Sequence, residues 1–265
     1  MLRLLLLSLL GALLLLLVGD QVRRHYIVDV SGASASEVPL RRRPATPRPP
    51  ATGTAVPSPA AAGVNGTATV ERLARLAIRK RISEDAPATY IDSLLLTTDS
   101  VVRRWTERVA APLRVAIVEG GTPDYQPHLV GYVYEAMHRW EALGLGLRFD
   151  VVPDTTDADI VVRWIDRFDI DRTGQADLAW DRLGRIRRAS IQLALRDSAG
   201  TALSDEALLA VAVHEIGHAI GLPHSADPED VMYPATRTGV LSPRDRRTAA
   251  LLYQLPAGPI SDRAD

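Results

Sequence analysis

Three of the six histidines fall within eleven residues, and their spacing dictates how the backbone must run there. His214 and His218 are four residues apart, so on a helix their side chains project from the same face. Two imidazoles placed in this way can meet one zinc ion. A straight helix cannot supply a third ligand from another direction, but Gly221 has no Cβ and can turn the chain back through a left-handed conformation. His224 would then approach the same point, so this segment requires a helix that ends in a sharp turn.

Glu215 is the residue that gives this histidine cluster a chemical use. One step round the helix from His214, its carboxylate would lie beside the metal and accept a proton from a zinc-bound water. Three protein nitrogens leave a fourth position open, as in catalytic zinc sites, whereas structural sites are usually closed by four protein ligands. If the helix histidines served only for packing, Glu215 would be buried among Leu, Val and Ala without a partner, which is costly. The residues therefore favour one catalytic Zn²⁺ held by His214, His218 and His224, with Glu215 as general base.

Hydrophobic patterns elsewhere in the chain indicate an α/β arrangement with a mixed sheet. Short apolar runs rich in β-branched residues predict strands, and apolar residues three or four apart predict helices, whose ends are marked by Pro, Ser and Gly. The predicted strands are residues 113–118, 147–152, 160–165 and 189–195, and the predicted helices are residues 127–144, 203–221 and 242–253. Strands and helices in this order pack as layers around one core.

Residues 214–224 reproduce the zinc signature of the metzincin metalloproteases. Ser225 directly after the third histidine, and Val-Met-Tyr-Pro at residues 231–234, resemble the matrixin branch, the matrix-metalloproteinase type. The similarity covers about residues 105–256. It implies an α+β metzincin-like domain with a twisted mixed five-stranded sheet, two long helices, an active-site cleft and a C-terminal helix. It also implies that Met232 lies in a tight turn beneath the metal and supports it.

The resemblance further implies a zinc-dependent endopeptidase that acts on polypeptide substrates. An edge strand near residues 176–180 would pair with an extended peptide and so add a strand to the sheet. We expect a monomer. Two alternatives stay open, namely a membrane-tethered binding module that holds zinc without proteolytic activity, and a zinc amidase that acts on cell-wall crosslinks.

The chain departs from animal-type matrixins in several respects. Residues 165–181 contain no histidine for a structural zinc, and the chain has no cysteine for a thiol-based latency device or for disulfides. Five aspartates in or at the end of this loop could bind Ca²⁺, although a solvated acidic loop is the favoured explanation. They are Asp166, Asp169, Asp171, Asp177 and Asp181. The position two residues after the proline, which often carries a Tyr in the wall of the family's specificity pocket, is Thr236.

The first hundred residues differ in composition from the rest. Residues 1–30 contain a leucine run behind Met1 and Arg3, which predicts a signal peptide or an uncleaved signal anchor and places the rest outside the cytoplasm, secreted or membrane-anchored. Residues 31–66 are rich in Pro, Ala, Ser and Thr and are predicted to be a disordered linker. Residues 67–104 are predicted to be a helical extension that could be a prosegment, a spacer or part of the catalytic fold, and residues 257–265 a tail. The net charge of −1 gives no indication of a nucleic-acid partner.

Overall fold

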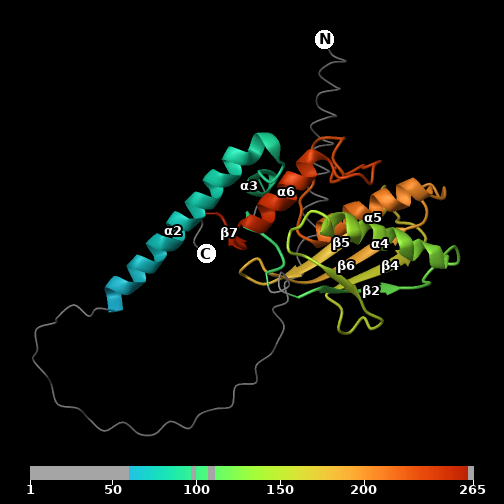
Figure 1. The fold of residues 1–265 in the computed structure, drawn as a ribbon, viewed down its shortest axis with the longest axis horizontal. Coiled ribbons are helices and arrows are strands. Elements are labelled where there is room, and N and C mark those ends of the chain that lie inside the picture. The colour runs from blue at the N-terminus through green and yellow to red at the C-terminus, as the bar shows by residue number, and fades with distance from the viewer. Residues whose placement is uncertain (1–59, 97–99, 107–110, 262–265) are drawn as a thin grey trace, which may run out of the picture.

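The computed structural model describes residues 60–96, 100–106 and 111–261 (Figure 1). The predicted signal or anchor segment, residues 1–30, lies outside the described residues, as does the predicted linker up to residue 59. Within the described ranges, no helix has the length and apolar character needed to cross a membrane.

A five-stranded mixed sheet forms the centre of the molecule, which confirms the predicted metzincin-like fold. Its strands in chain order are β2 (Leu113–Val118), β3 (Phe149–Val151), β4 (Ile160–Ile165), β5 (Gly174–Trp180) and β6 (Ile186–Ala194). They lie in the order β3-β2-β4-β6-β5, with the first four parallel and β5 antiparallel to β6. β5 is therefore an edge strand with one free side. In β6 the predicted alternation holds, because Ala189, Ile191 and Leu193 are all buried.

Two helices cover one face of this sheet. The 3₁₀ turn η2 (Pro127–Leu129) leads into α4 (Val130–Glu141), and α5 (Asp205–Ala219) lies beside α4 (Figure 1). Val133 of α4 and Ile216 of α5 line the same interior space as Ile191 of β6, so the three elements share one core. The indole N–H of Trp140 donates to the carbonyl of Val213 at 2.9 Å and ties the two helices together.

The C-terminal helix α6 (Pro243–Gln254) begins with a complete capping box. The Ser242 hydroxyl accepts from the Asp245 N–H, and the Asp245 carboxylate accepts from the Ser242 N–H. Pro243 at the first helical position lacks only an N–H that would have no partner within the helix. These local signals explain why the sequence predicts the start of this helix correctly.

The N-terminal extension contains α2 (Ala60–Asp85), η1 (Ala86–Ala88), α3 (Ser93–Leu96) and β1 (Val101–Val102). α2 begins inside the range predicted as linker, at a run of three alanines, the residue with the highest helix propensity. Its middle part carries exposed apolar side chains, including Val70, Leu73 and Leu76. Its N-terminal end projects away from the sheet (Figure 1).

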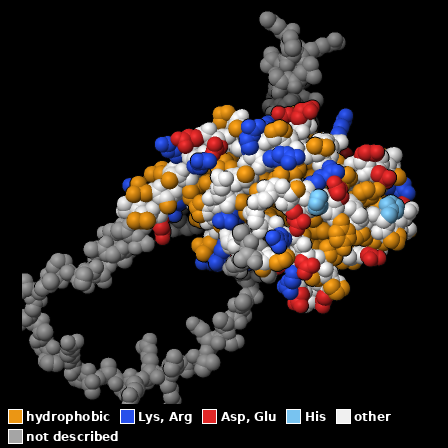
Figure 2. All heavy atoms as spheres, viewed as in Figure 1, with side chains coloured by type: hydrophobic (Ala, Val, Ile, Leu, Met, Phe, Trp, Pro, Cys, Tyr) orange, Lys and Arg blue, Asp and Glu red, His pale blue; other side chains and the backbone are white. Residues whose placement is uncertain are grey.

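The second half of the extension packs against the sheet-bearing part of the chain. Ile82, Tyr90, Ile91 and Leu94 are buried in the same core cluster as the sheet and α5. β1 pairs antiparallel with β7 (Gly258–Pro259), which lies in the segment predicted as a tail. On the face shown in Figure 2, acidic and basic side chains are interspersed and no single-sign surface forms.

Candidate metal centre

The three histidines of the motif converge on one point. α5 carries His214 and His218 on one face, and the loop after the helix brings His224 to them. The Nε2 atom of His224 lies 3.3 Å from that of His214 and 3.0 Å from that of His218. Among the described residues, these three form a group whose ligand atoms are close enough together to hold one metal ion.

A turn at the end of α5 makes this convergence possible. Gly221 has a φ of +103°, and its N–H donates to the carbonyl of His218 while the Leu222 N–H donates to that of Gly217. These two bonds form a Schellman motif, which reverses the chain after the helix. A Cβ at Gly221 would also lie 2.3 Å from the carbonyl oxygen of Arg103. Both the backbone conformation and the space therefore require glycine here.

Backbone carbonyls fix the orientation of two of the imidazoles. Nδ1 of His214 lies 2.7 Å from the Val231 carbonyl, and Nδ1 of His218 lies 2.9 Å from the Leu222 carbonyl. A carbonyl can only accept, so each Nδ1 carries the proton and each Nε2 presents a lone pair. Both lone pairs lie within 3.3 Å of Nε2 of His224, so the three nitrogens are placed to share one cation.

The electrostatics of the cluster also fit a metal. Burial lowers the pKa of His214 and, together with the two neighbouring imidazoles, brings that of His218 well below its usual value. Burial, followed by the influence of His214, lowers the pKa of His224 to about 3. All three rings are therefore neutral at physiological pH, the form that binds metal.

Glu215 lies beside the cluster without contributing to it. It is buried, and among the described residues its Oε2 atom has no hydrogen-bond partner. Burial raises the pKa of its carboxyl to about 8, partly offset by the positive charge of Arg172. A divalent ion among the three imidazoles would favour the ionised carboxylate. The backbone of β5 passes close by, because a Cβ at Gly174 would lie 2.4 Å from Oε1 of Glu215.

Met232 lies directly against α5, inside the buried turn that follows the third histidine. The Ser225 N–H donates to the Met232 carbonyl at 2.9 Å, which joins the two ends of this loop. A Cβ at Gly217 would lie 2.4 Å from the Met232 sulfur. Since Gly217 stands between His214 and His218 on the helix, the methionine contacts the segment that carries both rings.

The acidic residues of the loop before and within β5 do not form a second metal-binding group among the described residues. The Asp181 carboxylate instead accepts from Arg185 and Arg187, at 2.8 and 2.9 Å. Asp166 pairs with Arg196, and Asp177 accepts from Gln175. The predicted calcium site therefore has no support in this structure.

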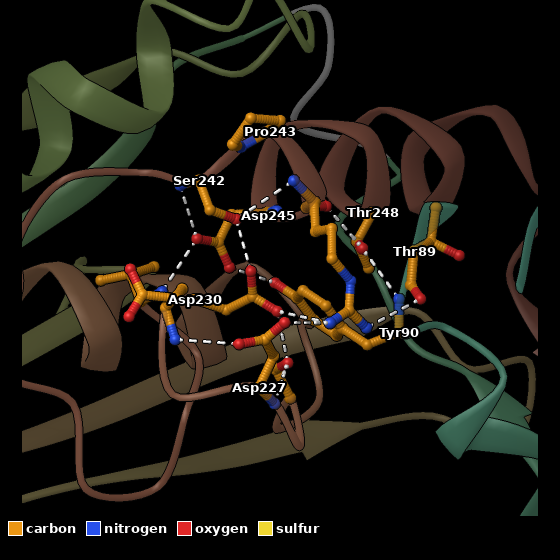
Figure 3. A network of polar contacts seen from close by, with 12 residues as sticks. Thr89, Tyr90, Asp227, Asp230, Ser242, Pro243, Asp245 and Thr248 are labelled. Atoms are coloured by element: carbon orange, nitrogen blue, oxygen red, sulfur yellow. Dashed lines mark hydrogen bonds and ion pairs between the residues drawn. The ribbon is translucent and has the colours of Figure 1, made fainter. Parts of the chain in front are cut away.

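Two features of the site have no recognisable signal in the sequence. Gly174 allows β5 to approach Glu215, although a glycine at the start of a polar segment looks like any loop residue. Asp245 and Tyr90 belong to a buried polar network behind His214 (Figure 3), although they are separated by 155 residues in the chain. The start of α6 in the sequence indicates that Asp245 caps the helix, but it does not indicate that Tyr90 also binds this carboxylate.

Comparisons with known proteins agree with this geometry. The sequence model of the matrixin family, Peptidase_M10, matches residues 117–254. Matrilysin of Felis catus is 50% identical over 50 residues, which cover 17% of this chain and 19% of the relative. The chain thus matches less than a fifth of that protein's length. The family model covers more than half of the chain and runs from the end of β2 through α4, the other four strands of the sheet, α5 and α6, so the chain belongs to the matrixin family of peptidases.

Proposed function

We propose that this protein is a zinc-dependent endopeptidase in which His214, His218 and His224 hold one zinc ion and Glu215 is the general base. One observation carries the proposal: the Nε2 atoms of two buried imidazoles and one half-buried imidazole meet at one point, next to a buried carboxylate whose Oε2 atom has no hydrogen-bond partner among the described residues. A site built for structure alone would contain a fourth protein ligand, and the described residues supply three.

The chain's own residues would perform the proton transfers. When bound, zinc supplies a Lewis acid for the scissile carbonyl and brings the pKa of a water molecule towards 7. Glu215 would accept the proton of the attacking water and pass it to the leaving amine. Its burial suits this role, because an ionised carboxylate in a dry site is a stronger base than one in water.

The edge strand β5 supports a polypeptide substrate. Among the described residues no strand pairs with its outer side, so an extended peptide can form a further strand there. Its first residue, Gly174, lies against Glu215, so a peptide bound along this edge would run past the general base. A crosslink without an extended backbone would use few of these groups, so we favour polypeptide over a cell-wall amide.

Met232 would support the site from below. It is fully buried and packs against Gly217, between the two helix ligands, so it fixes the depth of that turn of α5. We assign it a packing role and no part in the proton transfers.

We further propose that the enzyme works outside the cytoplasm as a monomer. The matrixin family and the leucine run in residues 1–30 support export, and an uncleaved run would anchor the protein in the membrane. Mass spectrometry of the mature N-terminus distinguishes the anchored from the secreted form.

The assignment of Glu215 is tested by the Glu215→Ala variant. We expect it to retain zinc and to cleave unfolded casein roughly 10²- to 10⁴-fold more slowly, since this is the usual contribution of a general base. Glu206→Ala is the matched control, because Glu206 is an exposed glutamate in the first turn of the same helix. Undiminished casein cleavage by Glu215→Ala would remove Glu215 from the mechanism.

The same assay separates the alternatives. A chelator should abolish the cleavage of casein by the natural protein. Release of peptidoglycan fragments without casein cleavage would favour the amidase. A zinc-loaded protein that cleaves neither substrate would favour the binding module.

A further inference from the structure

A buried polar network joins the N-terminal extension to the loop that carries the metal centre (Figure 3). Thr89 and Tyr90 come from the extension, Asp227 and Asp230 from the loop after His224, and Ser242 and Asp245 from the start of α6. The network therefore connects three segments that are far apart in the sequence.

One arm of the network leads from Tyr90 to His214. The Tyr90 hydroxyl donates to Oδ1 of Asp245 at 2.8 Å. Oδ2 of Asp245 accepts from the Val231 N–H, also at 2.8 Å. The carbonyl of Val231 accepts from Nδ1 of His214 at 2.7 Å. Tyr90 thus holds the Asp245 carboxylate, and that carboxylate fixes the N–H of Val231, the residue whose carbonyl binds the His214 imidazole.

A second arm leads to the residue after His224. The hydroxyls of Ser225 and Ser242 donate to the two oxygens of Asp230, each at 2.5 Å. The guanidinium of Arg244 pairs with Asp230 and Asp227 and donates to the Thr89 carbonyl at 3.2 Å. Both ends of the metal-binding segment are therefore tied to residues 89–90.

Because the network is buried, water cannot replace the partners in these hydrogen bonds. Tyr90 is 3% exposed, Asp230 1% and Asp245 0%, so none of them can exchange its partner for water without moving. Burial and the Asp245 carboxylate raise the pKa of Tyr90, so its hydroxyl keeps its proton and always donates. Without that donor, Oδ1 of Asp245 would be left unsatisfied in the interior, and the carboxylate would turn to seek another partner.

We propose that Tyr90 is a positioning residue for His214, acting through Asp245 and Val231, and that residues 86–96 and 100–105 are a permanent part of the metal site and not a removable prosegment. Two further contacts agree with this. The indole N–H of Trp105 donates to the Ala219 carbonyl at the end of α5, at 2.9 Å, and Arg103 lies against Gly221. The inference rests on the proposed zinc function, because it concerns the orientation of a zinc ligand.

The test compares the zinc affinities of the purified natural protein, Tyr90→Phe and Ser93→Ala, measured by competition with a chromophoric chelator. Tyr90→Phe removes one hydroxyl and keeps the packed ring. Ser93→Ala is matched, because it also removes one hydroxyl bond of 2.8 Å from the same segment, but that bond ends on the Tyr90 carbonyl and not on Asp245. Outer partners of metal ligands commonly contribute 10- to 100-fold in affinity. Tyr90 is more distant from the metal than such a partner, so we expect Tyr90→Phe to raise the zinc Kd by about tenfold, at the lower end of that range. We expect Ser93→Ala to leave the zinc Kd unchanged.

Thermal unfolding of the three metal-free proteins and the absorption spectrum of their cobalt-substituted forms complete the test. A positioning role predicts an altered cobalt spectrum in Tyr90→Phe alone, even if both variants unfold at lower temperature. Equal zinc affinities in all three proteins, or an equal loss in both variants, would overturn the inference and leave the zinc proposal intact. Failure of the natural protein itself to bind zinc would instead overturn the proposed function.

Discussion

At the scale of single residues, Glu215 shows the conflict between stability and function most clearly. A carboxylate that is buried and lacks a hydrogen-bond partner for Oε2 among the described residues destabilises the fold whenever it is ionised. In the folded metal-free protein, burial raises its pKa to about 8, compared with 4.5 for an unperturbed carboxyl. The residue that the proposed reaction needs is therefore one that folding alone would not select.

This pKa difference gives a prediction for Glu215→Gln. Between pH 4.5 and pH 8 the folded metal-free protein keeps a proton on Glu215 that the unfolded chain releases, so this group lowers the free energy of unfolding as pH rises through that window. A glutamine at this position does not titrate, so its contribution to stability does not change with pH. We therefore expect Glu215→Gln to stabilise the metal-free protein more at pH 8 than at pH 5, with a gain on the order of a few kcal/mol.

Urea denaturation of both proteins at the two pH values, with a chelator present, provides the measurement. The three histidines titrate in both proteins, so to first order their contribution cancels in the difference. A stability difference that is the same at pH 5 and pH 8 would show that Glu215 does not titrate as its burial implies.

At the scale of elements, the end of α5 determines whether His224 reaches the other two rings. Gly221→Ala would force a side chain into a left-handed backbone, which costs about 1–2 kcal/mol, and place its Cβ against the Arg103 carbonyl. We expect the variant to lose more than about 2 kcal/mol of stability and at least tenfold in zinc affinity, because the turn and the ligand behind it must shift.

The Gly144→Ala variant separates the cost of a strained backbone from the cost of displacing a neighbouring residue. Gly144 also has a positive φ, +67°, but a Cβ there would meet nothing within 4 Å. We expect the Gly144→Ala variant to lose about 1 kcal/mol of folding stability, as measured by urea denaturation, and to retain its zinc affinity, as measured by chelator competition. Equal losses of stability and of zinc affinity in the two variants would show that the close approach of Arg103 to Gly221 does not contribute to the effect.

The sequence predicts the elements whose signals are local. β4 and α6 begin and end as expected or within one residue, because an apolar run and a capping box are written in adjacent residues. β5 is the opposite case. Its sequence, GQADLAW, has no apolar run and all of its side chains are half-buried, so only the family resemblance indicated it. β1 and β7 have two residues each, and their pairing across more than 150 positions leaves no local pattern.

The same distinction applies to the candidate site. The three histidines and Glu215 lie within one motif, and helical spacing together with the turn at Gly221 predicts their positions without knowledge of the fold. The contacts of Tyr90 with Asp245, of Gly174 with Glu215 and of Arg103 with Gly221 join segments that meet only after folding. Such contacts depend on tertiary packing, for which a single sequence contains no periodic signal.

At the scale of the whole molecule, the chain has no cysteine and so no disulfide, and its fold depends on its hydrophobic core and, we expect, on the metal centre. A ligand that binds only the folded state stabilises it by about 4 kcal/mol at a thousandfold excess over its Kd. For a domain of this size, each kcal/mol changes the unfolding temperature by about 2–4 °C. We expect a chelator to lower the Tm of the zinc-loaded protein by about 10 °C, and added zinc to restore it.

Scanning calorimetry with and without chelator measures this shift. His224→Ala is the control, because it removes one ligand and should show a much smaller response to zinc. A natural protein whose Tm is unaffected by chelation, after metal analysis has shown zinc to be bound and then removed, would mean that the metal contributes nothing to folding.

The pairing of β1 with β7 brings Val102 beside Gly258, so the chain enters and leaves the sheet-bearing part at neighbouring points. Gly184, in the turn after β5, lies against both strands. An insertion at residue 100 and an extension after residue 261 would therefore crowd the same corner, near the far end of β5. Reporter tags should consequently be inserted elsewhere, since moving a tag from one of these two positions to the other would not relieve obstruction of a long peptide leaving that edge.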